Sequence, residues 1–144
     1  MRKGKYAVLF ICSLAIFTWI GLAKAQKAKM VKLPNGEEVV DIRGEWDTLI
    51  EHYGKWSTYG KETNVFEITL KDHKFYVFRM KDGKYHPRNS MAIRGELDKD
   101  GIKKVQLMTG LVGWIDAKGQ ISEDGNKIII DAADKVRLTL VSKK

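Results

Sequence analysis

The sequence predicts an all-β fold: a single domain built as an eight-stranded antiparallel up-and-down barrel, preceded by an N-terminal signal peptide. Two observations predict the barrel. From residue 39 onward, apolar residues recur at every second position, which is the period of a strand with one buried face. Asp82-Gly83, Asp100-Gly101 and Asp124-Gly125 separate these runs, and such glycines supply the positive φ of tight hairpins. Hairpins in succession indicate an antiparallel sheet.

Residues 1–25 have the pattern of a signal peptide. A basic start (Arg2, Lys3 and Lys5) precedes an apolar run over residues 6–23, and a small-x-small motif ends at Ala25. The run spans 18 residues, close to the shortest length that crosses a bilayer, so a retained membrane anchor is the alternative. In both cases we expect export, to the periplasm or the extracellular space.

The remaining chain has no thiol, because Cys12 lies inside the apolar run and is the only cysteine. Disulfides and cysteine metal ligands are therefore excluded after residue 25. That part has 119 residues, enough for one core, and its 22 basic and 18 acidic residues give a formal charge of +4. The charges are mixed along the chain, as on a solvated face, and nucleic acid is not an expected partner.

Residues 26–38 are expected to form a linker or an N-terminal arm, because they combine several lysines with the turn-like Leu33-Pro34-Asn35-Gly36. The first strand is expected over residues 39–52. For residues 46–56 a helix is the alternative, since Trp46, Ile50 and Tyr53 also have helical spacing. A strand is preferred because it places the charged residues on one face and continues the pattern of residues 39–43.

The later strands follow from the same alternation and from the turns between them. They are expected over residues 64–71, 74–81, 89–98, 102–109, 113–122, 127–132 and 135–142. Closing eight strands into a barrel over residues 39–144 removes the unpaired edges. The side chains expected to face inward are Ile42, Trp46, Ile50, Phe66, Ile68, Leu70, Phe75, Val77, Met91, Ile93, Val105, Leu107, Ile115, Ile121, Ile128, Ile130, Val136, Leu138 and Leu140.

The hexapeptide at residues 42–47, IRGEWD, returns at residues 93–98 as IRGELD. In an up-and-down barrel the two copies fall on the first and fourth strands, which run in opposite directions, so a duplicated domain does not relate them. A shared strand pattern explains them better. Each copy has an inward Ile, an inward Gly where the wall bends or a bulky neighbour crosses, and an inward apolar residue.

Gly44-Glu45-Trp46 on the first strand, eight antiparallel strands and Arg137 in the last strand together resemble the lipocalin and calycin superfamily. Residues 119–130 are also similar to the final hairpins of small bacterial lipocalin-like exported domains. The resemblance implies structural roles for Gly44, Trp46 and Arg137, with Trp46 closing one end of the barrel near Arg137. A barrel packed with its own side chains is the alternative to a roomy ligand cup within this fold.

Residues with catalytic or metal-binding chemistry are few and scattered. His52, His73 and His86 lack the spacing of a zinc site. No serine lies in a Gly-x-Ser-x-Gly motif, and the acidic pairs fall at expected turns. We therefore expect no enzyme activity, no metal and no cofactor.

The aromatic group between Trp46 and Tyr59 is more informative. It ends in the glycine-containing loop Tyr53-Gly54-Lys55-Trp56-Ser57-Thr58-Tyr59, which lies at an open end of the predicted barrel. The lipocalin resemblance implies a lid role for this loop, and polar-tipped aromatics suit a ligand rim. The alternative is a loop that folds back and plugs the barrel.

Two functions remain. In the first, the protein is an exported binding module that holds a small apolar or amphipathic ligand, with Trp56 and Tyr59 as the gate. Its lining would be Trp46, Phe66, Phe75, Val77, Met91 and Ile93. In the second, a packed barrel is a structural or interaction module of the cell envelope, and an outward stripe of Tyr76, Phe78 and Met80 contacts an envelope protein or a second copy. The membrane is a partner only if residues 6–23 stay as an anchor.

Overall fold

The computed structural model describes residues 27–53, 60–110, 112–133 and 135–144. The expected signal peptide, as well as Trp56 and Tyr59, lie outside these residues. The strands are β1 (Met30–Lys32), β2 (Glu38–Val40), β3 (Gly44–His52), β4 (Lys61–Lys71), β5 (Lys74–Arg79), β6 (Met91–Asp98), β7 (Gly101–Thr109), β8 (Gly113–Ile121), β9 (Lys127–Ala132) and β10 (Val136–Ser142).

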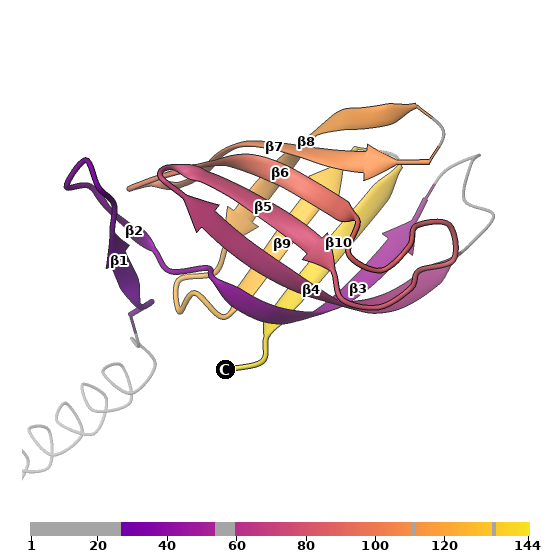
Figure 1. Ribbon diagram of the computed structural model, residues 1–144, viewed down its shortest axis with the longest axis horizontal. Coiled ribbons are helices and arrows are strands. Elements are labelled where there is room, and N and C mark those ends of the chain that lie inside the picture. The colour runs from indigo at the N-terminus through magenta and orange to yellow at the C-terminus, as the bar shows by residue number, and fades with distance from the viewer. Residues whose placement is uncertain (1–26, 54–59, 111, 134) are drawn as a thin grey trace, which may run out of the picture.

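Strands β3 to β10 form a closed antiparallel barrel in the order β10-β3-β4-β5-β6-β7-β8-β9 (Figure 1). The sheet closes because β3 pairs with β4 on one side and with β10 on the other. The predicted all-β class and the eight-stranded up-and-down barrel are confirmed. The helical alternative for residues 46–56 is wrong over its described part, because β3 runs as a strand to His52.

The strand expected over residues 39–52 is divided at residues 41–43. Gly44 has a φ of +115°, a backbone conformation that a residue with a Cβ rarely adopts. Next to it, the backbone N–H of Arg43 donates to Asp41 Oδ1, so the chain turns before β3 begins. The first part, β2, pairs with β1 in a separate two-stranded sheet.

This β1–β2 hairpin is an N-terminal arm that covers one end of the barrel (Figure 1). Leu33 and Val39 are 6% and 0% exposed and belong to the barrel's hydrophobic core. Glu37 Oε1 accepts a hydrogen bond of 2.9 Å from the backbone N–H of Lys99 in the β6–β7 turn. The arm is therefore part of the packed structure.

The core fills the inside of the barrel with side chains that alternate along each strand. Apart from Met91, the residues predicted to face inward belong to the core or pack against it, with Leu70, Ile115 and Ile121 partly buried. The prediction that Met91 faces inward is wrong. This residue is partly buried, lies outside the core cluster and pairs with Phe78. A β-bulge explains it, because the register shifts between Val77 and Phe78 and buries Ala92 in its place.

The end of the barrel beneath the arm is closed by Trp46, which is 2% exposed and donates from Nε1 to the carbonyl of Ile42 at 2.9 Å. Arg137 does not lie over it, contrary to the expectation from the resemblance. The register pairs Arg137 with Glu51 and Trp46 with Ser142, and alternation turns Arg137 outward, where it holds Asp131 at 3.3 Å. Several other cations lie at this end: Lys144 packs over Gly44, and Lys27, Lys29, Arg43 and Lys144 line a hollow with Trp46.

Within the described ranges, no helix is long and apolar enough to cross a membrane.

Candidate functional site

The inside of the barrel is filled where a ligand was expected to bind. Phe66, Val77 and Ile93 are fully buried, and Phe75 and Trp46 are 1% and 2% exposed. These residues do come together, as the sequence predicted, but as a packed core. Two hollows lie elsewhere: one of about 660 Å³ over the outer face of β5–β8, and one of about 270 Å³ between the arm and the end closed by Trp46.

The opposite end of the barrel, the mouth, carries a buried cation. Arg79 follows Phe75 and Val77 on the inward face of β5 and is 6% exposed. Its Nη1 donates to Ser90 Oγ at 2.9 Å and to the carbonyl of Met91 at 3.3 Å. Among the described residues, no carboxylate lies within ion-pair distance of it. The other two nitrogens, Nε and Nη2, make no hydrogen bond among the described residues. Every fully buried side-chain nitrogen there has a partner, so these two atoms have some contact with solvent.

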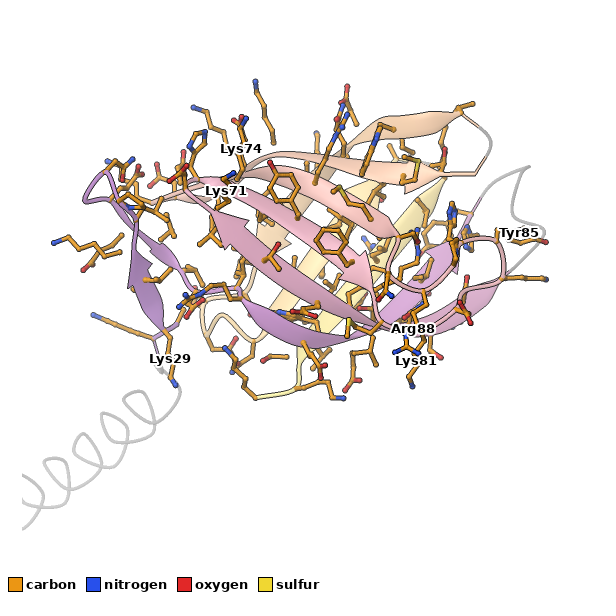
Figure 2. The ribbon with its side chains drawn as sticks, viewed as in Figure 1. Lys29, Lys71, Lys74, Lys81, Tyr85 and Arg88 are labelled. Atoms are coloured by element: carbon orange, nitrogen blue, oxygen red, sulfur yellow. The ribbon has the colours of Figure 1, made fainter. Side chains whose placement is uncertain are left out.

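Burial and neighbouring charges shift the pKa values of Arg79 and His86. Burial lowers the pKa of Arg79, and the charge of Glu62 opposes that shift. The pKa of His86 lies below its usual 6.5, first because of burial and then because of the charge of Arg79, while Glu62 again acts in the opposite direction. His86 is therefore neutral at pH 7. Figure 2 places Tyr85, from the same β5–β6 connection, at the far end of the molecule from Lys29, and Arg88 beside Lys81 at the lower side of the barrel.

The outer face of β5–β8 carries the larger hollow. Across it runs a row of side chains that the register sets directly opposite one another: Tyr76 opposes Arg94, Arg94 opposes Gln106, and Gln106 opposes Asp116. Every member of this row lines the hollow. Directly opposed residues on one face have Cβ atoms about 5 Å apart, so the row is continuous across four strands.

Arg94 is the centre of this row, and two neighbours fix it in place. Its guanidinium stacks on the Trp114 ring, 4.1 Å from the centroid, and its Nε donates to Gln106 Oε1 at 2.9 Å. Gln106 is held in turn, because its Nε2 donates to Asp116 Oδ1 at 3.0 Å. Both Nη atoms of Arg94 make no hydrogen bond within the described part of the chain. The Arg94 side chain is therefore exposed and held in place by two neighbours, and its two Nη atoms are available to a ligand.

The predicted interaction surface lies on and beside this hollow. Tyr76 lines it, and Tyr76, Phe78 and Met80 are all partly buried. Phe78 pairs with Met91 one row farther along the strands, and Met108 pairs with Trp114. On the other side of the row lies Lys74, next to Lys71 at the β4–β5 turn (Figure 2). The outer face therefore places basic and apolar side chains on opposite sides of one polar row.

No sequence pattern pointed to Arg79, Arg94 or Trp114 as site residues. Strict alternation from Val77 and Ile93 would have placed Arg79 inside and Arg94 outside. The stacking of Arg94 on Trp114 had no sequence signal, because these residues lie 20 positions apart on strands that are not direct neighbours.

The described residues contain no group of three or more His, Cys, Asp or Glu side chains that could hold a metal ion. His73 is near Glu96 alone, at 4.0 Å.

No protein-family model, curated protein or solved structure matches this chain. The barrel is compatible with a lipocalin-like fold.

Proposed function

We propose that this protein is an exported, non-enzymatic interaction module of the cell envelope, a lipocalin-like barrel that binds a partner protein on the outer face of β5–β8. The observation that carries the proposal is the fixed cluster of Tyr76, Arg94 and Trp114 beside a hollow of about 660 Å³. Tyrosine, arginine and tryptophan are the residues most enriched at the centres of protein interfaces. The packed interior supports the same proposal, because core side chains occupy the place where an internal ligand would bind.

The direct test places a photo-crosslinking amino acid at position 76, in cells that export the protein. The matched control places it at position 137, because Arg137 is also exposed on the outside of the barrel but lies away from the hollow. We expect a discrete cross-linked product from position 76, lost in the Trp114→Ala chain, and no such product from position 137. Equal products from both positions, or none from position 76, would refute the outer-face interaction.

A second candidate function is favoured by one observation, the buried Arg79 with an open Nε and Nη2 edge at the mouth. A guanidinium edge of this kind binds a carboxylate through two parallel hydrogen bonds. The protein would then bind a small amphipathic anion at the mouth, above the packed core. The ligand would then lie at the end of β5, where Phe66 is directly opposite Arg79, and not among Trp46 and Phe75 in the packed core.

Native mass spectrometry of protein purified from its own envelope tests this candidate. A ligand held by Arg79 should appear as a fixed added mass that disappears in Arg79→Met and persists in Arg137→Met. A bare-chain mass in every preparation would eliminate the mouth as a ligand site. That result would leave the outer-face interaction unaffected.

A further inference from the structure

We infer that the outer face of β5–β8 takes an acidic, partly apolar segment of a partner protein, and that Arg94 binds one of its carboxylates. This inference rests on the proposed interaction function and adds the chemical class of the partner. Three features carry it: the fixed geometry of Arg94, the unbalanced charge around the hollow, and the apolar row beside it.

The guanidinium of Arg94 is preorganised to bind a carboxylate, because contacts within the chain itself orient it. Stacking on Trp114 and the hydrogen bond from Nε to Gln106 fix the plane of the guanidinium. The two Nη atoms then present a fork that matches a carboxylate. Two other exposed arginines already hold such a group: Arg43 binds Asp41 at 2.8 Å, and Arg137 binds Asp131 at 3.3 Å. Arg88, which is also exposed, has no ion pair among the described residues, but no aromatic ring or side-chain hydrogen bond fixes its guanidinium there. Arg94 has no carboxylate partner among the described residues, although Asp116 lies only one residue beyond Gln106 in the row.

The net positive charge around the hollow also favours an anionic partner. Four cations line it, Lys74, Arg94, Lys103 and Lys104, and none of them has an ion-pair partner within the described chain. Two acids also line it: Asp116 accepts a hydrogen bond from Gln106, and Glu96 lies directly opposite both Lys74 and Lys104 in the register. Four positive and two negative charges leave a local excess of two, which favours and orients an acidic partner.

The apolar row indicates that the partner is a protein segment. Phe78, Met91, Met108 and Trp114 lie on the side of the polar row away from Lys74, and all are partly buried. A segment with apolar side chains beside its carboxylates would cover this row while its acids contact Arg94 and the lysines. An acidic polysaccharide carries no apolar side chains to cover it. An anionic membrane would meet the lysines without needing the fork of Arg94.

The test is an NMR titration that follows the Arg94 Nε–H and Trp114 indole N–H signals of the full exported chain. The probe is a short synthetic peptide in which glutamate alternates with leucine, and its matched control has glutamine in place of glutamate. Polygalacturonate and phosphatidylglycerol vesicles form two further arms. We expect saturable shifts with the glutamate peptide and binding weaker by roughly tenfold or more with the glutamine peptide. Arg94→Lys should show the same loss, whereas Arg137→Lys should bind as the wild type does.

Several results would overturn the inference. Equal binding of the two peptides would show that carboxylates are not recognised, and tighter binding of polygalacturonate or vesicles would assign the face to that class of partner. An unchanged affinity in Arg94→Lys would remove Arg94 from the site. If the cross-link from position 76 persists in any of these cases, the interaction function stands and only the acidic class of the partner fails. If that cross-link is absent as well, both fail.

Discussion

The two glycines of the repeated hexapeptide do different things. Gly44 is required by its backbone, since its φ of +115° is rarely adopted by other residues, and a Cβ there would meet only the flexible end of Lys144. Gly95 is required by its neighbours, because a Cβ would lie 2.5 Å from Phe75 Cζ and 2.3 Å from the carbonyl oxygen of Lys104. The sequence suggested both reasons, a bend or a crossing side chain, and each copy uses one.

A double-mutant cycle distinguishes these two reasons. Gly95→Ala should lower the free energy of unfolding by about 1 to 3 kcal/mol, because its Cβ overpacks the core against Phe75 and also meets the Lys104 carbonyl, a contact that no change at Phe75 relieves. Phe75→Leu should therefore cost less stability in the Gly95→Ala background than in the wild type. In the Gly44→Ala background, the cost of Phe75→Leu should be unchanged. Urea unfolding measures all of these values, and additivity at Gly95 would contradict the crossing of Phe75.

His86 predicts a pH dependence of stability. Its pKa is lowered in the folded state, so the unfolded chain binds more protons once the pH falls below the usual value of 6.5. The free energy of unfolding should therefore decrease as the pH falls below about 6.5. His86→Gln should flatten this slope. His73→Gln, which removes an exposed imidazole, should leave it in place, and an unchanged slope in His86→Gln would refute the assignment.

At the scale of the element, two β-bulges decide which residues meet on the outer face. The β6–β7 turn alone would pair Arg94 with Val105, because it sets Asp98 opposite Gly101. The register shift between Glu96 and Leu97 adds Lys103 as an extra residue and brings Gln106 opposite Arg94. No alternation pattern reveals such an insertion. The strands were therefore predictable from the sequence, and the row built across them was not.

The long β5–β6 connection depends on one buried amide. Asn64 is 5% exposed; its Nδ2 donates to the carbonyl of Lys81 at 3.1 Å, and its Oδ1 accepts from the backbone N–H of Val65 at 2.7 Å. Asn64→Leu should cost about 1 to 3 kcal/mol, because the amide's partners lose their hydrogen bonds. Hydrogen exchange should accelerate across residues 80–90. The exposed control Thr69→Ala should change neither quantity, and an unaltered exchange rate in Asn64→Leu would contradict this anchoring role.

The arm gives a second prediction at this scale. Leu33 lies in the core, whereas Met30 on the same hairpin is 47% exposed. Leu33→Ala should lower the free energy of unfolding of the whole barrel by about 2 to 5 kcal/mol, the usual range for a buried leucine. Met30→Ala should have little effect. Denaturation curves for the two variants would coincide if residues 27–38 were only a linker.

For the whole molecule, period-two alternation and short turns in the sequence predicted the closed barrel. They leave few other ways to pair the backbone N–H and C=O groups at the edges of an eight-stranded sheet. The sequence also predicted most of the core, but not the buried residues Leu33, Val39, Ala92 and Ala132. It could not predict whether the interior is filled, since that depends on how large side chains such as Phe66 and Phe75 meet from neighbouring strands. The place of Lys144 at the closed end was likewise missed, because it depends on the strand register, which puts Arg137 elsewhere on the barrel.

The central claim is that the barrel binds on its outer face while its core stays packed. Trp114 and Trp46 report on these two places, since Trp114 stacks outside on Arg94 and Trp46 donates to the Ile42 carbonyl at the closed end. The most direct measurement is the NMR spectrum of their indole N–H groups before and after solubilised envelope proteins are added. We predict that the Trp114 signal shifts or broadens while the Trp46 signal stays unchanged. A change at Trp46 with an unchanged Trp114 would contradict the claim.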